Sequence, residues 1–426
     1  MRKTAVVMNM FYTGLGIARS LGERGIPVIG LTARRGVYGN HTRYARTVFA
    51  PDSREQPEAL LAKLLELGKE LNDRAIIFPT RDDDVVFLDR FREELSPFYI
   101  LTVPEHPVIE DCLDKWKTYL CAVKAAVPTP KCWLIESEES LRRQLTDLEY
   151  PCVLKPVAAH HWRKGANWEL VGGRKAVGVW NEAELLREYK SVSQANPLVL
   201  AQAFVPGADD SLVIAACYFD RSSRFVAGFN TRKLIQIPEG FGTGCIVQTA
   251  NVPELFEATS RLLQTMRFTG IAEVEYKWDA GRKVYQLIEI NPRPWDQHSL
   301  GRSIQCDLIY MAYCEHAGLP CEPMKAAPRD RKWIAEDGFV TAALQLLWRR
   351  DPAVFRLLAL ARGTRTYAIW SWRDPLPFLI YMTTRFIPGL ILNSMRLIWS
   401  KLAGGASKKT GGLVYERRFK NENVHN

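Results

Sequence analysis

The sequence lacks the cysteine pairs that build zinc sites and disulfide frameworks. Its nine cysteines are odd in number and never spaced as Cys-x-x-Cys; they stand at positions 112, 121, 132, 152, 217, 245, 306, 314 and 321. This usage is typical of reduced thiols in a cytoplasmic protein. The pair His160-His161 has no further ligands at metal-binding spacing, so we expect it to be structural or to face a substrate.

The chain also lacks a long uncharged hydrophobic run. The most apolar stretch, Phe378 to Trp399, is interrupted by Arg385 and Pro388, so it does not predict a membrane span. The N-terminal run MRKTAVVMNM breaks at Asn9 without a small-residue cleavage site, which predicts a first strand rather than a signal peptide.

Positive charge is concentrated at the C-terminal end. From Lys325 to Asn426 there are 18 Lys and Arg against 7 Asp and Glu, whereas the preceding residues are balanced. A tail of one sign attracts anionic surfaces. Arg385 and Arg396 lie about three helical turns apart and share a face, which fits an interfacial amphipathic helix on a membrane. A helix packed on the body of the protein fits the same pattern, and both interpretations stay open.

The first 110 residues predict an α/β domain with a parallel sheet. Strands at 4–8, 28–32 and 75–79 alternate with helices at 15–24, 55–71 and 85–95. Gly14-x-Gly16 lacks the rest of a dinucleotide fingerprint, so we expect it to form a turn. Arg81 follows a strand end where a ligand at a switch point would sit, and it either meets a substrate carboxylate or helps to cap a helix.

The most informative stretch is GIAEVEYKWDAGRKVYQLIEINPRPWDQ, residues 270–297. It predicts two strands, 271–278 and 284–290, around a turn at 279–281. Carboxylates are depleted in strands and costly to bury unpaired, yet Glu275 and Glu289 stand there. If Trp278 faces Val284, then Glu275 pairs with Leu287 and Glu289 is its diagonal neighbour on the same face.

Asn291 follows Glu289 on that face, and together with Glu275 the three side chains form an all-oxygen site that suits Mg²⁺ carrying substrate phosphates. Arg293 adds a planar fork for phosphate or carboxylate. The combination Glu-(13)-Glu-x-Asn-Pro-Arg resembles the ATP-grasp superfamily. The resemblance implies an ATP-grasp fold after a Rossmann-like domain, with ATP and Mg²⁺ as ligands and Arg293 as the catalytic residue.

Further residues match this resemblance in the expected order. Lys155 ends a buried strand just before a proline, where a lysine needs an anionic partner. The resemblance implies that Lys115 and Lys155 bind phosphates and that the loop 158–173 covers them. It also implies that the adenine edge meets a hinge formed by Gln202, Phe204 and Val205, and that Asp209, or alternatively Asp210, binds the ribose. Arg81 and Trp295 are expected on the substrate side.

We expect the chain to have five parts. The resemblance implies a Rossmann-like domain (1–110), a small lobe (111–197) and a large lobe with the magnesium hairpin (198–324). Composition and apolar patterning predict a helical basic extension (325–403) and a flexible tail (404–426).

The implied function is an ADP-forming carboxylate–amine ligase similar to D-aspartate ligase-like enzymes. A carboxylate is activated as an acyl phosphate and then attacked by an amine. We expect small-molecule substrates or a lipid-linked acceptor, no nucleic acid, and a cytoplasmic protein, peripheral on the inner membrane face if the tail binds lipid. The alternatives are another ATP-grasp reaction such as carboxylation, and a non-catalytic nucleotide-binding scaffold at the membrane.

Overall fold

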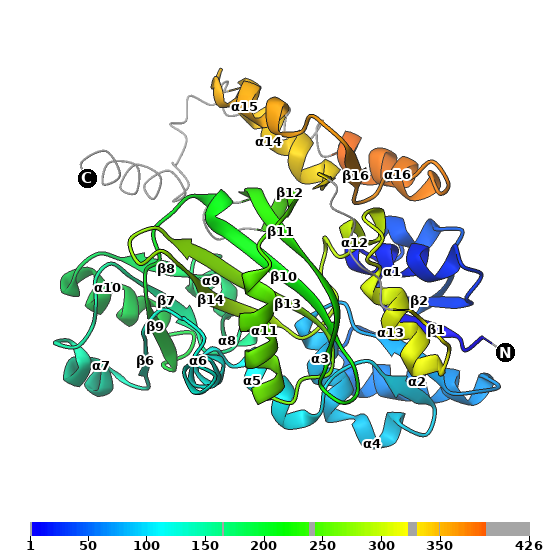
Figure 1. Cartoon of the computed structure of the whole chain (residues 1–426), viewed down its shortest axis with the longest axis horizontal. Coiled ribbons are helices and arrows are strands. Elements are labelled where there is room, and N and C mark those ends of the chain that lie inside the picture. The colour runs from blue at the N-terminus through cyan, green and yellow to red at the C-terminus, as the bar shows by residue number, and fades with distance from the viewer. Residues whose placement is uncertain (1, 164–165, 238–242, 323–329, 349, 389–426) are drawn as a thin grey trace.

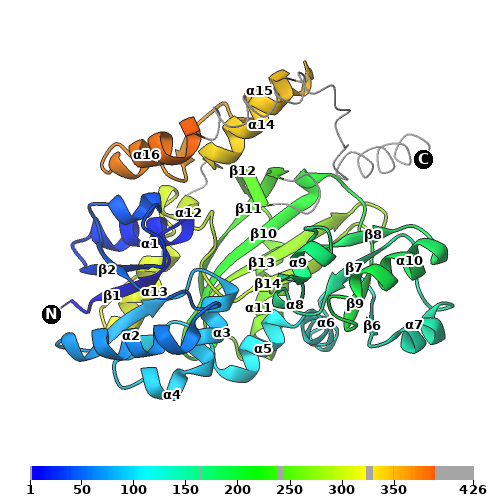
Figure 2. The ribbon, with the colours of Figure 1, turned by 180° about the vertical axis from the view of Figure 1, so that it is seen from behind.

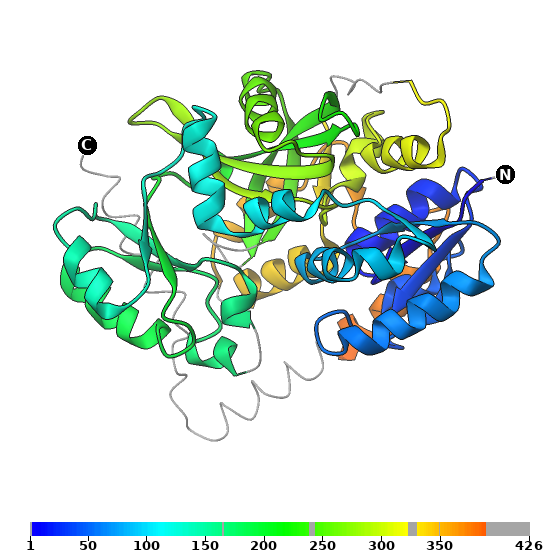
Figure 3. The same cartoon turned by 90° about the horizontal axis from the view of Figure 1, so that it is seen from below.

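The computed structural model describes residues 2–163, 166–237, 243–322, 330–348 and 350–388. Three sheets form its framework (Figure 1). Seen from below, a parallel sheet and a small antiparallel sheet lie at opposite ends, with the large sheet between them (Figure 3). The predicted tail 404–426 lies outside the described residues, and the residue boundaries of the domains stay predictions.

The N-terminal domain is the parallel α/β sheet that the sequence predicted. Its strand order is β3-β2-β1-β4-β5, all parallel. The strands are β1 (Ala5–Met8), β2 (Val28–Thr32), β3 (Arg46–Phe49), β4 (Ala75–Phe78) and β5 (Tyr99–Leu101). The helices are α1 (Tyr12–Gly22), α2 (Pro57–Glu70), α3 (Asp82–Arg90) and α4 (Arg92–Leu95), with a short 3-10 helix at Tyr38–His41. Strands β3 and β5 are additional to those predicted.

Gly14 and Gly16 lie inside α1, so the predicted turn is wrong. A side chain at Gly14 would place its Cβ 1.9 Å from the carbonyl oxygen of Asn9. At Gly16 the Cβ would lie 2.7 Å from Nε2 of His298. Both glycines therefore allow close packing of α1, first against the end of β1 and then against the large lobe.

The small antiparallel sheet has the order β6-β9-β7-β8. Its strands are β6 (Cys132–Ile135), β7 (Cys152–Pro156), β8 (Val177–Val179) and β9 (Val199–Ala203). The helices along this part of the chain are α5 (His106–Leu113), α6 (Lys115–Lys124), α7 (Glu138–Gln144), α8 (His160–Arg163), α9 (Asn167–Leu170) and α10 (Glu182–Val192). The expected phosphate-covering loop thus contains two short helices, α8 and α9, within its described residues.

The large sheet has the order β14-β13-β10-β11-β12-β15-β16. Its strands are β10 (Leu212–Phe219), β11 (Phe225–Ile237), β12 (Thr243–Ala250), β13 (Gly270–Asp279), β14 (Val284–Asn291), β15 (Lys332–Ile334) and β16 (Arg365–Tyr367). Helices α11 (Glu254–Thr265), α12 (Ser299–Ser303) and α13 (Leu308–Ala317) belong to the same part of the chain. Strands β9 and β10 lie in different sheets, so the segment between them links two lobes and is not a hairpin loop.

The C-terminal extension packs on the body and adds two strands to the large sheet. Its helices are α14 (Glu336–Trp348), α15 (Ala353–Leu360) and α16 (Leu376–Tyr381), followed by a π-helical turn at Met382–Phe386. They form a layer along one side of the molecule (Figures 1 and 2). Buried Asp374 pairs with Arg19 of α1 at 2.9 Å, which ties this layer to the N-terminal domain. The extension is thus packed on the body as far as Pro388, whereas the rest of the predicted amphipathic helix, including Arg396, lies outside the described residues.

Candidate active site

The predicted site residues surround one cleft, which has a volume of about 520 Å³. Lysines of the small lobe, the hinge, the β13–β14 hairpin and the start of α3 all contribute to its wall. Of the predicted residues, Lys115, Lys155, Gln202, Phe204, Val205, Glu275, Glu289, Asn291, Arg293, Arg81 and Trp295 line it. Asp209 is not among the lining residues.

The hairpin places two carboxylates opposite each other, in a register that differs from the predicted one. Trp278 pairs with Tyr285, and the register then shifts, so that Glu275 lies directly opposite Glu289. The shift is a bulge that inserts one extra residue in β14. The prediction that Glu275 pairs with Leu287 is therefore wrong, but the two carboxylates are closer neighbours than predicted.

Each of these carboxylates meets a lysine. Lys233 of β11, only 5% exposed, donates to both carboxylate oxygens of Glu275 at 2.8 and 2.9 Å. Burial opposes the charge of Lys233, but the carboxylates of Glu275, Glu273 and Glu289 together outweigh it and raise the pKa of Lys233. Lys115 of the small lobe lies 3.5 Å from Glu289. Among the described residues no three His, Cys, Asp or Glu side chains form a ready metal cluster.

Glu273 completes this wall, and the sequence prediction did not select it. It lies two residues before Glu275 on the same face and directly opposite Asn291, whose Nδ2 donates to it at 3.0 Å. Burial, with Glu275 beside it, raises the pKa of Glu273 to about 8. The sequence did carry a signal for Glu273: it stands two residues before Glu275 in the same strand, so both carboxylates lie on one face.

Arg293 connects the hairpin with the N-terminal domain. Its Nε donates to Asp82 of α3 at 2.6 Å, and one terminal nitrogen donates to Oδ1 of Asn291 at 3.3 Å. Burial opposes the charge of Arg293, yet the Asp82 carboxylate raises its pKa. Its guanidinium is therefore held as a cation at the edge of the oxygen-rich wall.

The second predicted lysine lies beside the hinge. Lys155 of β7 donates to Oε1 of Gln202 on β9 at 2.6 Å. Burial lowers the pKa of Lys155, although Glu289 acts in the opposite direction. After Gln202 the chain leaves the small sheet, and the ring of Phe204 lies 5.1 Å from the ammonium of Lys277. Burial lowers the pKa of Lys277 to about 8.

Asp209 is engaged within the protein. Its two carboxylate oxygens accept hydrogen bonds from the backbone and side-chain nitrogens of Gln236 at 2.9 and 2.8 Å. Sequence reasoning did not foresee this contact, because Gln236 lies on β11 and a single sequence carries no signal for that pairing.

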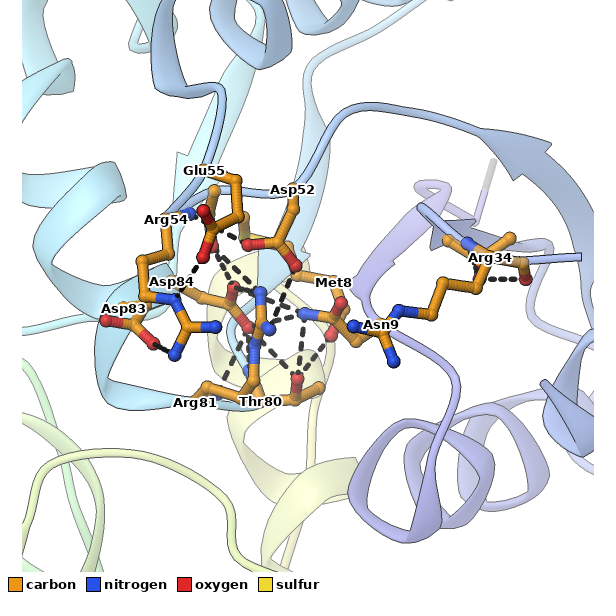
Figure 4. Close-up of polar contacts among 12 residues, drawn as sticks. Met8, Asn9, Arg34, Asp52, Arg54, Glu55, Thr80, Arg81, Asp83 and Asp84 are labelled. Atoms are coloured by element: carbon orange, nitrogen blue, oxygen red, sulfur yellow. Dashed lines mark hydrogen bonds and ion pairs between the residues drawn. The ribbon is translucent and has the colours of Figure 1, made fainter. Parts of the chain in front are cut away.

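Arg81 lines the cleft but is held by acidic neighbours. Figure 4 shows its guanidinium within a polar network at the ends of β1 and β4. It contacts Asp52 and Asp84 at 3.0 Å each, and fully buried Asp84 also accepts from the backbone nitrogens of Thr80 and Arg81, just before α3. The capping alternative is therefore seen at Asp84, while the substrate role of Arg81 stays a prediction.

Trp295 lines the cleft and is buried. Its side chain is 2% exposed and packs against Phe229 and His298. Its indole Nε1 has no hydrogen-bond partner among the described residues. A buried indole N–H normally finds an acceptor, so this donor is suited to a ligand oxygen.

Comparisons with known proteins identify the fold. No known family profile matches the chain. It is 22% identical to D-aspartate ligase from Enterococcus faecium over 268 residues, which are 59% of this chain and 62% of that protein. The chain thus matches less than two thirds of this relative.

Two solved structures share the architecture. N5-carboxyaminoimidazole synthetase from Staphylococcus aureus, complexed with ADP, superposes with a TM-score of 0.63 at 15% identity, covering 83% of this chain and 87% of that one. L-amino acid ligase from Bacillus licheniformis has a TM-score of 0.56 at 16% identity, covering 75% of each chain. The chain therefore has the ATP-grasp fold that the hairpin motif predicted, preceded by a Rossmann-like domain and followed by a largely helical extension.

Proposed function

We propose that the protein is an ATP-dependent ligase that activates a carboxylate as an acyl phosphate and couples it to an amine, with release of ADP and phosphate. The observation that carries this proposal is the pairing of two carboxylates, each next to a lysine, in a cleft that also contains Arg293 and Lys155. The sequence similarity to a D-aspartate ligase supports the same reaction class.

The hairpin fits a magnesium ion bound together with a nucleotide. Glu275, Glu289 and Asn291 offer the oxygen ligands that Mg²⁺ prefers. When bound, the ion would neutralise phosphate charge. The lysines that now meet Glu275 and Glu289 show that these carboxylates favour cationic partners. Glu273 keeps Asn291 oriented through its amide nitrogen, so that the amide oxygen is directed away from Glu273.

Lys115, Lys155 and Arg293 are the proposed phosphate and transition-state contacts. Phosphoryl transfer depends mainly on position and charge neutralisation, which lysine and arginine side chains provide. We assign Lys115 and Lys155 to the phosphates of ATP. Arg293 stabilises charge on the transferring group, for which its fixed position beside Asn291 is suited.

The reaction proceeds in two balanced steps. A substrate carboxylate oxygen attacks the γ-phosphorus, and the bond to the β,γ-bridging oxygen breaks, giving an acyl phosphate and ADP. The amine nitrogen then attacks the acyl carbon, phosphate leaves with the bonding electron pair, and the nitrogen loses a proton. No side-chain nucleophile is required in either step.

The adenine end of the cleft is assigned to the hinge. Phe204 and Val205 would offer backbone groups to the base, with Gln202 beside them. For Asp209 to bind the ribose, its carboxylate has to exchange a hydrogen bond that it now accepts from Gln236. Arg81 and Trp295 are assigned to the substrate end.

We assign an amino acid, or an amino group on a cell-surface precursor, as one substrate, by analogy with the D-aspartate ligase relative. The protein would work in the cytoplasm, with peripheral association on the inner membrane face where the acceptor is lipid-linked. No helix within the described ranges has the length and apolar character needed to cross a bilayer.

The direct test is a screen of amino acids and of lipid- or sugar-linked carboxylates for release of ADP and phosphate. Release that requires both a carboxylate and an amine supports the ligase. Release that requires bicarbonate instead would favour carboxylation. Binding of ATP without turnover in the presence of any acceptor would favour a scaffold.

Glu289→Ala should abolish turnover, by about 100-fold or more, because it removes one carboxylate of the metal-binding pair. The fold should be retained, because Glu289 faces the cleft. Glu254→Ala, at an exposed position on α11, is the matched control. Protection of each variant against thermal unfolding by Mg·ADP gives a readout independent of turnover. Near-normal ADP formation by Glu289→Ala would refute the metal assignment.

A further inference from the structure

The exposed apolar side chains of the protein gather on its C-terminal extension. Of the 16 large hydrophobic side chains that are exposed in the described residues, eight lie between positions 347 and 387. Trp372 is 85% exposed and Phe355 is 73% exposed. Scattered exposed hydrophobic residues are normal, but a concentration in one layer indicates an interaction surface. We name it the outer C-terminal face; it consists of Trp348, Phe355, Leu358, Trp372, Leu376 and Leu379.

The helices of this layer already bury a different face against the protein. In α15, Val354 and Leu357 are buried in the core, whereas Phe355 and Leu358 are exposed. In α16, Pro377 and Tyr381 are buried, whereas Leu376 and Leu379 are exposed. Residues three apart share one side of a helix. Packing on the body therefore leaves a second apolar side on both helices.

The charge exposed on this layer is mainly positive. Between residues 347 and 388 all six described arginines are exposed: Arg350, Arg356, Arg362, Arg365, Arg373 and Arg385. Of the two acids in the same stretch, Asp374 is buried against Arg19, and Asp351 is half-exposed and accepts from the backbone nitrogen of Ala353.

Arg373 pairs with Glu23, and Arg365 donates to the backbone oxygen of Ala361. The other four arginines, at positions 350, 356, 362 and 385, form no ion pair within the part of the chain that the structure describes. Their guanidinium groups are thus available to an external anion.

We propose that the outer C-terminal face docks on a bilayer that contains anionic lipid. Exposed tryptophan, phenylalanine and leucine insert at the boundary between head groups and acyl chains, while arginine binds lipid phosphates and keeps its charge at the interface. A nucleic acid would use the arginines but not Leu358, Leu376 or Leu379. A second copy of the chain would bring another face whose exposed charge is mainly positive, which repels the first.

This surface would provide the peripheral membrane association proposed above, and the contact would be made by folded helices. Only the reason for the association, namely access to a lipid-linked substrate, rests on the proposed function. Lipid docking needs no turnover, and turnover with soluble substrates needs no lipid, so the two proposals fail separately.

The experiment is flotation of the full-length protein with vesicles of phosphatidylcholine alone or mixed with phosphatidylglycerol. We expect flotation with the mixed vesicles, little with phosphatidylcholine, and loss of binding at high salt. Absence of flotation with both vesicles would overturn the proposal.

Substitutions then locate the surface. Phe355→Ser, Leu358→Ser and Leu379→Ser combined should abolish flotation. Leu120→Ser with Val123→Ser, at exposed positions on α6, should leave it unchanged. Equal flotation of the two variants would contradict the assignment. If the triple variant instead converts a dimer into a monomer in analytical ultracentrifugation and the wild type does not float, the face binds a second copy.

The charge is tested separately. Arg356→Gln, Arg362→Gln and Arg385→Gln combined should weaken binding to the mixed vesicles on the order of 100-fold, because each arginine near an anionic surface contributes about fivefold. Arg142→Gln with Arg143→Gln, on exposed α7 positions, is the control. An affinity that stays within twofold of the wild type would refute the electrostatic part of the proposal.

Discussion

Lys233→Met tests whether the clustered carboxylates of the cleft need a neighbouring cation for the stability of the fold. Lys233 is 5% exposed and holds both oxygens of Glu275 at 2.8 and 2.9 Å. Its removal leaves Glu275 opposite Glu289 and beside Glu273 without its closest cation. Removing one partner of a buried ion pair costs about 3–5 kcal/mol. We expect a loss near 3 kcal/mol, because the Glu275 side chain is 15% exposed and keeps contact with solvent in the cleft.

The assay is urea unfolding followed by tryptophan fluorescence, with and without Mg·ADP. If Glu275 and Glu289 bind Mg²⁺, the bound ion replaces part of the positive charge that the substitution removes. The variant should therefore lose less stability when Mg·ADP is present. Lys190→Met, at an exposed position of α10, should change neither measurement. An undiminished stability of Lys233→Met without metal, or an equal loss with and without metal, would refute this reasoning.

Two further predictions concern buried charged or titratable groups outside the cleft. Arg19→Met should destabilise the protein by about 3–5 kcal/mol, because it leaves Asp374 buried without the Arg19 guanidinium. Proteolysis should then cleave the C-terminal extension faster. Adding Asp374→Leu should recover part of the stability. Burial lowers the pKa of His298, whose Nε2 lies 3.0 Å from the carbonyl oxygen of Thr13. The folded state thus binds fewer protons, so stability should fall as pH drops below about 6.5, the pKa of an unperturbed histidine. In urea titrations at pH 7.5 and 5.0, His298→Gln should show a smaller difference than the wild type.

The sequence predicted the hairpin because its signals are local. Period-two alternation, turn residues at 279–281 and carboxylates in an apolar setting all lie within one stretch of the chain. The bulge that brings Glu289 opposite Glu275 was not predictable, because one inserted residue leaves the alternation of each strand almost unchanged. The short strands β15 and β16 were missed for a related reason, since three residues carry too little periodicity.

The contacts between residues far apart in the sequence had no local signal at all. Arg293 meets Asp82 across 211 positions of the chain, and Asp209 meets Gln236 on a different strand. A single sequence shows that such charged residues exist but not which of them become neighbours. The family resemblance supplied the order of the site residues, whereas the partners of Arg81 and Asp209 required the structure.

The pairs in the cleft explain how it tolerates so much buried charge. Glu275 and Glu289 are balanced by Lys233 and Lys115, and the second of these pairs joins the large lobe to the small lobe. A magnesium nucleotide would bring a cation to the carboxylates and phosphates to the lysines. Each carboxylate would then have Mg²⁺ in place of a lysine, and each lysine would have a phosphate in place of a carboxylate. A buried charge costs most when it is unpaired, so this exchange keeps the charges compensated in both states. We therefore expect Lys115 to leave Glu289 when nucleotide binds, and the small lobe to shift with it.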